Sequence, residues 1–270
     1  MTFSFFSKLR GGGAEIRGHQ MASLIRGKFN PDAGYEGDTC VHVLGCTPRD
    51  GVDPARCYHD VMDCGLAKIS RVDRFPGGII ATSKSQYGVL RKEFPRRELH
   101  MIPQHHCNFD RERREDRPVL RVGCIGGDAA VQWPHWSVER MLKEIGLEWH
   151  FEVHYHTRRR VVAFYRTIDI QLCFRPTHPR GILNHLNTLK LANAGSFGIP
   201  TVALPEPAYS EEWPDACVFG DGMYDIMLKI KSLKENPQLY AECSNRASLR
   251  AEEYHYENIL PLYRALPGAV

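Results

Sequence analysis

The segment 187–211, NTLKLANAGSFGIPTVALPEPAYSE, constrains the fold more than any other part of this chain. Its first half has the apolar spacing of an amphipathic helix, which we expect Gly195 and Gly198 to end. Residues 201–204 form the short apolar run of a strand buried on both faces of a parallel sheet, and two prolines stop that strand. Because ligands bind at the carboxyl ends of parallel strands, the acidic loop 206–211 marks a candidate site.

Strands and helices alternate along the whole chain. The other predicted strands lie at residues 3–6, 38–44, 77–82, 100–103, 119–125, 149–155 and 168–174, and a further short element ends within 60–63. The predicted helices open near residue 16 and then lie within 83–94, 136–145, 157–166, 181–194, 225–233, 237–254 and 256–266. This alternation predicts a parallel α/β architecture.

The charged segment 104–118, QHHCNFDRERREDRP, divides the chain into two halves of similar pattern. We interpret it as a linker and place the domain boundary at 115/116, which predicts domains at 1–115 and 116–254. Two α/β domains joined in this way predict a cleft between them as the place for a ligand.

Composition indicates a soluble globular protein. The chain has 270 residues, of which 43% are hydrophobic and 25% charged, enough to bury one large core or two smaller ones. No apolar run reaches the roughly 18 residues that a membrane span needs, and the N-terminus lacks a signal-peptide pattern. The nine cysteines include no C-x-x-C pair, so we expect buried, reduced thiols and a cytoplasmic protein.

Positive charge is concentrated in the first half. Residues 1–118 carry 19 Lys and Arg against 15 Asp and Glu, within a net charge of +3 for the whole chain. A basic half suits an anionic partner, and a nucleic acid is one such class.

The order of helix, Gly-x-Pro turn, strand and acidic loop in 187–211 resembles the donor-binding half of GT-B glycosyltransferases, where the pattern NA-x-x-x-GIP-x-VA recurs. The resemblance implies two Rossmann-like parallel-sheet domains that face a cleft. It also implies a nucleotide-sugar donor in the second domain, no cofactor or catalytic metal, and a last segment, 255–270, that crosses back to the first domain.

A nucleotide-sugar donor carries a diphosphate, whose charge must be held and neutralised as the glycosidic bond breaks. Lys190 matches the lysine of the family, and Arg175 directly follows a predicted strand. The full set of donor-binding candidates combines cations, the glycine turn and groups for the sugar or ribose hydroxyls: Gly126, Gly127, Arg175, Arg180, Thr188, Lys190, Glu206 and Glu211.

In the first domain His19 is the candidate base that deprotonates the acceptor, because histidine titrates near neutral pH. Asp60 and Asp63, at the end of a predicted strand, are alternative bases. The loop that precedes the first helix supplies the candidates for contact with phosphate or acceptor: Gly12, Gly13 and Arg17.

One feature departs from the family. The large retaining GT-B family has two glutamates eight positions apart, and the equivalent positions here hold His185 and Asn193. Retention or inversion at the sugar carbon therefore stays open. We expect no metal site, because the chain has no D-x-D triplet and the pair His105–His106 lacks a histidine four residues on.

The favoured function is transfer of a sugar from a nucleotide-diphosphate-sugar to an acceptor hydroxyl. Acceptors left open are a polyanion such as DNA with a hydroxylated base, a saccharide, and a lipid-linked sugar. Two alternatives also stay open: a non-catalytic nucleotide- or nucleic-acid-binding module, which the missing glutamates favour, and a sugar-nucleotide epimerase of the same fold, which would turn over donor without acceptor.

Overall fold

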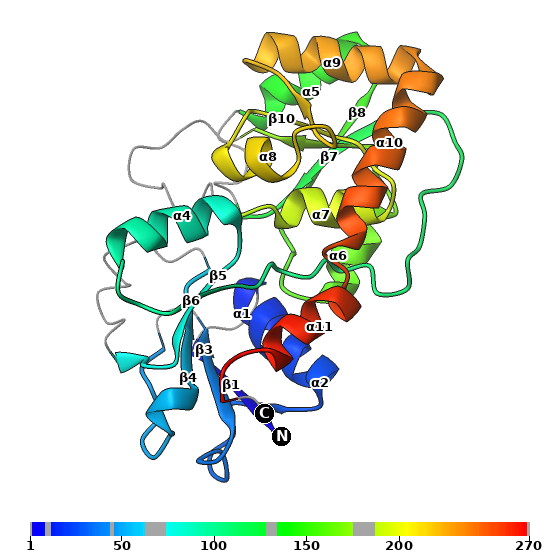
Figure 1. Ribbon diagram of the computed structural model, residues 1–270. Helices are drawn as coiled ribbons and strands as arrows, with labels where there is room; N and C mark the ends of the chain where they lie inside the picture. Colours follow the sequence, from blue (N-terminus) through cyan, green and yellow to red (C-terminus); the bar gives the residue numbers. More distant parts are fainter. Residues whose placement is uncertain are drawn as a thin grey trace. The chain divides into compact units, whose positions relative to one another are not determined.

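A computed structural model describes residues 2–8, 12–43, 46–62, 74–127, 134–174 and 187–268. These residues form two compact units (Figure 1). The first unit contains Met1–His105 and the C-terminal Tyr256–Val270, and the second contains His106–His178 and Thr188–His255. The second unit thus begins at His106, whereas the sequence suggested a boundary at 115/116.

The first unit is built on a parallel sheet with the order β2-β1-β3-β4-β5-β6 in its described part. Its strands are β1 (Phe3–Ser7), β2 (Lys28–Phe29), β3 (Thr39–Val43), β4 (Cys57–Asp60), β5 (Gly78–Ala81) and β6 (Leu99–Met101). Every residue of β1, β3, β4 and β5 is buried, as expected for parallel strands covered on both faces. The short strand β2 has no counterpart among the predictions.

The helices in the described part of the first unit are α1 (Gly12–Ala14), the π-helix η1 (Glu15–Gln20), α2 (Met21–Ile25), the 3-10 helix η2 (Pro54–Arg56), α4 (Lys84–Glu93) and α11 (Tyr256–Arg264). The first three form one continuous helical segment that follows β1. A π-helix has an i→i+5 hydrogen-bond pattern and is rare, and the sequence pattern did not indicate one. Ser83 caps α4, as its hydroxyl accepts the Gln86 N–H at 3.0 Å.

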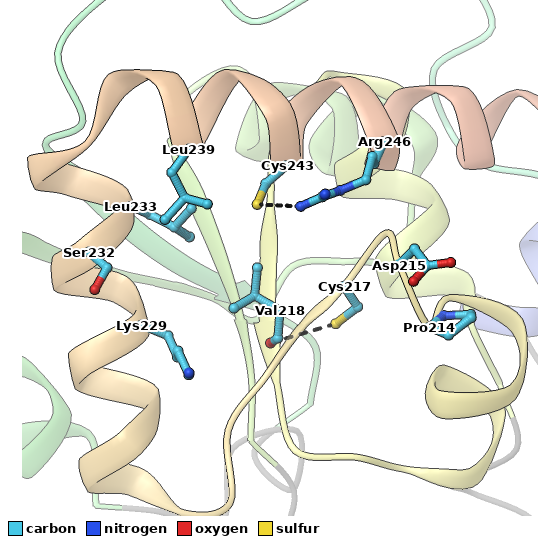
Figure 2. Close-up of a pocket in the computed structure, with 10 residues that line it drawn as sticks. All are labelled: Pro214, Asp215, Cys217, Val218, Lys229, Ser232, Leu233, Leu239, Cys243 and Arg246. Carbon is cyan, nitrogen blue, oxygen red and sulfur yellow. Dashed lines mark hydrogen bonds between the residues drawn. The ribbon is translucent and has the colours of Figure 1, made fainter.

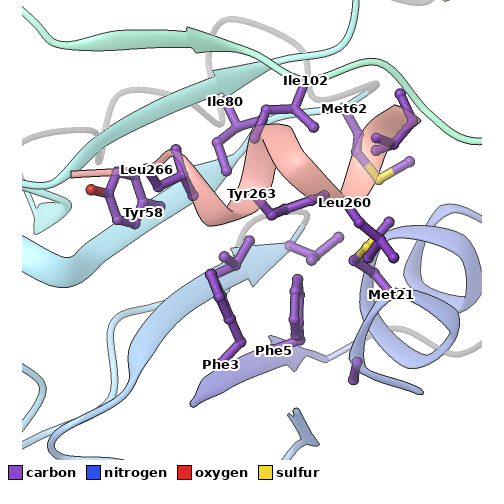
Figure 3. Close-up of a cluster of buried hydrophobic side chains, with 14 residues drawn as sticks. Phe3, Phe5, Met21, Tyr58, Met62, Ile80, Ile102, Leu260, Tyr263 and Leu266 are labelled. Carbon is purple, nitrogen blue, oxygen red and sulfur yellow. The ribbon is translucent and has the colours of Figure 1, made fainter. Parts of the chain in front are cut away.

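The last helix of the chain completes the core of the first unit. Tyr263, Leu260 and Leu266 from the C-terminal segment pack with Phe3 and Phe5 of β1 (Figure 3). The Tyr58 hydroxyl also donates to the carbonyl of Pro267. The hydrophobic core of this unit is therefore built from both ends of the chain.

The second unit is also built on a parallel sheet, with the order β11-β10-β9-β7-β8 in its described part. Its strands are β7 (Arg121–Ile125), β8 (Glu148–Glu152), β9 (Ile170–Cys173), β10 (Thr201–Ala203) and β11 (Val218–Phe219). Its helices are α5 (His135–Glu144), α6 (Arg158–Tyr165), α7 (Leu189–Ser196), α8 (Pro207–Glu212), α9 (Met223–Glu235) and α10 (Pro237–Glu252). The predicted α/β class with parallel sheets is confirmed.

Two details of the segment 187–211 differ from the prediction. The residues expected to form an acidic loop are largely the helix α8, which begins at Pro207, a position where proline loses no hydrogen bond. Gly195 does not end α7 but lies inside it, because α10 packs there: a Cβ atom on Gly195 would lie 2.6 Å from the Ala247 carbonyl oxygen. Gly198, with φ +73°, forms the turn after the helix.

The charged segment expected to be a linker is fastened to the second unit. Asp169, which is 1% exposed, accepts hydrogen bonds from Arg114 Nε at 2.9 Å and Arg117 Nε at 3.0 Å. Its other oxygen accepts the backbone N–H groups of Leu120 and Arg121 at 2.9 and 2.8 Å. Burial acts to raise the pKa of Asp169, but these four hydrogen bonds outweigh it and lower the pKa.

Candidate functional site

The glycine turn of the second unit follows β7 directly. Gly126 has φ +153°, a conformation that side chains disfavour, and its N–H donates to the Glu152 carbonyl at 3.0 Å. A Cβ atom on Gly127 would lie 3.4 Å from the Tyr155 hydroxyl. The turn therefore lies at the carboxyl end of the sheet, with a tyrosine beside it.

Lys190 reaches the same end of the sheet from α7. Its Nζ lies 3.5 Å from Sγ of Cys124, the residue two positions before Gly126 in the sequence. The Lys190 carbonyl accepts the side-chain amide of Gln171 in β9 at 2.9 Å, which fixes the first turn of α7 against the sheet. The structure thus places the Lys190 ammonium against the strand that leads into the glycine turn.

The acidic candidates lie on or beside α8, immediately after β10. Glu206 is 5% exposed and precedes the helix, whereas Glu211 is exposed on it. Glu212, which sequence reasoning did not single out, is also buried and accepts the Tyr254 hydroxyl at 2.7 Å. Thr188 is buried at the start of α7, where its carbonyl accepts the Ala192 N–H at 3.0 Å.

Asn193 occupies one of the two positions where the retaining family has a glutamate. It is buried, and its Oδ1 accepts the backbone N–H of Cys107 at 2.8 Å. The side chain therefore holds the segment that opens the second unit. The other position, His185, lies outside the described residues, as do the candidates Arg175, Arg180 and Asp63.

In the first unit Arg17 and Asp60 form a fully buried ion pair. Arg17 Nε donates to Asp60 Oδ2 at 2.6 Å, and Arg17 Nη1 donates to the Pro103 carbonyl at 2.7 Å. The Tyr263 ring lies over the guanidinium, 5.3 Å from it, and burial together with the charge of Asp60 raises the pKa of the tyrosine. Neither charged side chain has exposed surface, so in this structure neither presents an atom to a bound ligand.

His19 is on the outer side of the same helical segment. Its side chain is 60% exposed, and its Nδ1 lies 3.2 Å from Oε1 of Glu15. Sequence reasoning did not single out Glu15, although the spacing of four residues places two helical side chains on one face. Gly12 and Gly13 form the start of this helical segment, at α1.

A hollow of about 380 Å³ lies elsewhere in the second unit (Figure 2). Residues of α9, of α10 and of the segment leading into β11 line it, with Lys229 and Arg246 as its cations and Cys217 and Cys243 as its thiols. None of the candidate residues named above lines it.

Within the described residues, no three His, Cys, Asp or Glu side chains gather as they would around a metal ion. None of the described helices combines the length and apolar character that a membrane crossing requires. The cysteines of the described residues are buried thiols that form no disulfide.

Comparison with solved structures identifies the fold. HepE (Alr3699) from Anabaena, in complex with UDP, matches with a TM-score of 0.63 and 11% identity over 100% of each chain. The glycosyltransferase WaaG, involved in lipopolysaccharide biosynthesis, matches with a TM-score of 0.62 and 11% identity over 98% of this chain and 100% of its own. The chain has the GT-B fold.

A third structure extends the likeness. TarM from S. aureus, a G117R mutant in complex with fondaparinux, α-GlcNAc-glycerol and UDP, matches with a TM-score of 0.60 and 13% identity over 84% of this chain. The chain covers 55% of that TarM chain. Neither the protein-family models nor the sequences of curated proteins match.

Proposed function

We propose that the chain is a glycosyltransferase that transfers a sugar from a nucleotide-diphosphate-sugar to an acceptor hydroxyl. The donor is bound by the second unit, broadly the predicted 116–254, and the first unit carries the acceptor side. The observation that carries the proposal is the contact of Lys190 with Cys124, two residues before the glycine turn. It occurs in a GT-B fold, and HepE, which matches over the full length of both chains, was solved in complex with UDP.

In the donor site, Lys190 and the Gly127 N–H hold the diphosphate. Their positive charge stabilises the leaving nucleotide as the glycosidic bond breaks. The Gly126 N–H already donates to the Glu152 carbonyl, so Gly126 contributes the conformation of the turn. Arg175 and Arg180 remain proposed as further phosphate ligands. Bidentate arginine contacts suit a phosphate group geometrically.

We propose that residues at α8 and at the start of α7 hydrogen-bond the hydroxyl groups of the donor. Glu206 is buried and lies just after the carboxyl end of β10. Thr188 and Glu211 complete this proposed set.

On the acceptor side, we propose His19 as the base, with Glu15 orienting the imidazole. The 3.2 Å contact between them and the exposure of His19 support this choice over Asp60, whose carboxylate is committed to Arg17. Asp63 remains the alternative base, and the segment at Gly12 and Gly13 remains a proposed phosphate or acceptor contact.

The proposed acceptor is a saccharide or polyol hydroxyl. The TarM structure contains α-GlcNAc-glycerol, and WaaG acts in lipopolysaccharide biosynthesis. No observation on the described residues favours the DNA acceptor considered from the charge pattern.

The first experiment follows nucleotide release from UDP-glucose, UDP-GlcNAc and other nucleotide sugars, with and without simple saccharides. We expect release from one donor, accelerated by the correct acceptor, and an increase in Tm with UDP. Conversion of the donor into an epimeric nucleotide sugar without any acceptor would point to the epimerase, and stabilisation by UDP without turnover would point to the binding module. If the protein neither releases nucleotide from any donor nor is stabilised by UDP, the proposal is overturned.

Lys190→Gln tests the donor site directly. We expect kcat/KM for the donor to fall roughly 100-fold, because the variant keeps the size of the side chain but loses the charge facing the leaving diphosphate. Lys231→Gln is the matched control, since Lys231 is an exposed lysine of the same unit, and among the described residues its ion pair is with Glu235 at 3.8 Å. Equal kinetics for the two variants would remove Lys190 from the site.

A further inference from the structure

The π-helix η1 has an inner and an outer side with different roles. On the inner side Arg17 and Gly18 are buried, and Phe29 packs so closely that a Cβ atom on Gly18 would lie 2.7 Å from its ring. On the outer side His19 is exposed. π-helices often occur at functional sites, because the extra residue in the turn displaces side chains from their ordinary helical positions.

On the inner side, Arg17 links the helix to the sheet. Its guanidinium reaches Asp60 at the carboxyl end of β4 and the carbonyl of Pro103, two residues after β6. One side chain thus joins the π turn to two strands of the sheet. A buried charge with two directed contacts tolerates little rotation, since breaking either contact leaves a buried polar atom unsatisfied.

The third wall around Arg17 comes from the C-terminal helix. The Tyr263 ring lies 5.3 Å from the guanidinium and is fully buried, with its edge against Phe5 at 5.6 Å. An aromatic face over a desolvated guanidinium is attractive and restricts the plane in which the guanidinium lies. Tyr263 therefore packs on the guanidinium that pairs with Asp60.

The outer side carries a chain of contacts that ends at His19. His105 Nε2 lies 3.1 Å from Gln20 Oε1, and Gln20 Nε2 donates to Glu15 Oε1 at 3.3 Å. The same Glu15 oxygen lies 3.2 Å from His19 Nδ1. Glu15, His19 and Gln20 all belong to η1, so their positions depend on the backbone of the same helix to which Arg17 belongs.

We propose that Tyr263 is a positioning residue for His19. Its ring holds Arg17 against Asp60, which keeps the π turn in the register that places Glu15 next to the His19 imidazole. The C-terminal helix therefore contributes to the chemistry of the first unit without contacting the substrate. The kinetic part of this inference rests on the proposed function, in which His19 is the acceptor base.

The test compares Tyr263→Leu, which removes the aromatic ring, with Tyr263→Phe, which keeps it. Ile259→Ala is the control, because Ile259 is a buried residue of the same helix in the same core. For Tyr263→Leu we expect kcat to fall about tenfold with the donor KM unchanged, and the pH profile of kcat to change. Tyr263→Phe should behave like the wild type, and Ile259→Ala should lower Tm without changing kcat or the pH profile.

A second readout does not need activity. In protein labelled with ¹³C-histidine, the His19 imidazole signal should shift in Tyr263→Leu in the same direction as in Glu15→Gln, and stay in place in Ile259→Ala. Arg17→Lys, which keeps the charge and loses the planar contact, should shift it likewise and serves if Tyr263→Leu does not fold.

An unmoved His19 signal in Tyr263→Leu, or in Arg17→Lys if that variant replaces it, overturns the proposal. So does a loss of kcat no larger than that of Ile259→Ala. A wild-type protein without turnover on any nucleotide sugar would refute the proposed function, while the His19 signal would still decide the role of Tyr263.

Discussion

At the scale of single residues, buried charges in this chain hold segments together. Asp169 gathers two arginines and two backbone N–H groups, and Arg17 and Asp60 neutralise each other inside the first unit. Arg114 and Arg117, which the sequence placed in a linker, thus make internal hydrogen bonds. Arg17, a candidate for phosphate contact, does the same. Composition alone does not distinguish an exposed or ligand-binding arginine from one that makes internal hydrogen bonds, since the residue type suits both roles.

Asp169→Asn should lower the free energy of unfolding by about 3 kcal/mol, because its amide group must place an NH₂ against donors that now meet a carboxylate oxygen. Urea denaturation at pH 7 measures this. Glu148→Gln is the control: it removes an exposed ion pair with Arg121 and should change stability by at most about 1 kcal/mol. Similar losses in the two variants would contradict the structural role of Asp169.

At the scale of elements, close packing decided what the glycines of α7 do. The sequence pattern predicts that Gly195 ends the helix, but Gly195 lies within α7. The backbone of α10 packs against Gly195 and leaves no space for a side chain at this position. The acidic stretch after β10 became the helix α8 for a related reason: residues Ala208 and Tyr209 of that stretch find a buried environment. Helix propensity is a weak prior that tertiary contacts override.

Gly195→Ala should therefore destabilise the protein by about 1–3 kcal/mol, because the added methyl group forces α7 and α10 apart. Gly88→Ala provides the opposite case. Gly88 lies in the middle of α4 with nothing within 4 Å of its Cβ position, so alanine should stabilise the protein by up to about 1 kcal/mol. Thermal unfolding of both variants measures the difference, and two changes of the same sign would show that the contact with α10 is not the cause.

At the scale of the whole molecule, buried histidines make stability depend on pH. Burial lowers the pKa of His42 and of His59 to about 4, and that of His106 to about 3. The unfolded chain binds protons near pH 6.5 whereas the folded chain does not, so stability is complete above pH 6.5 and is lost as the pH falls towards 4. The lowered pKa of Asp169 acts in the same direction at lower pH.

Each such histidine should lower the free energy of unfolding by up to about 1.4 kcal/mol per pH unit within its window. His59→Phe is the informative variant, because the His59 ring stacks on Phe75 at 4.5 Å and phenylalanine keeps that contact. Urea titrations at pH 7.5, 6.0 and 5.0 should give a shallower decline for His59→Phe than for the wild type. Parallel declines would assign the acid sensitivity to other groups.

The sequence by itself determined the α/β class, the order of most strands and helices, and the fold that the neighbours of known structure share. These depend on local patterns: apolar periodicity, proline and glycine at element ends, and caps such as Ser83. Lys190 and the glycine turn were predicted from the resemblance to GT-B glycosyltransferases, which have a lysine and a glycine turn at the corresponding places. Their role in donor binding stays a prediction.

Only the tertiary structure decided which side chains face each other. Arg17 and Asp60 are 43 residues apart in sequence, Arg114 and Asp169 are 55 apart, and Tyr254 and Glu212 are 42 apart. No local pattern relates such positions, because their contact depends on how the strands pair and which helix covers them. The π turn at Glu15–Gln20 belongs to the same class, since a buried arginine under the C-terminal helix accompanies it and no periodicity in the sequence indicates it.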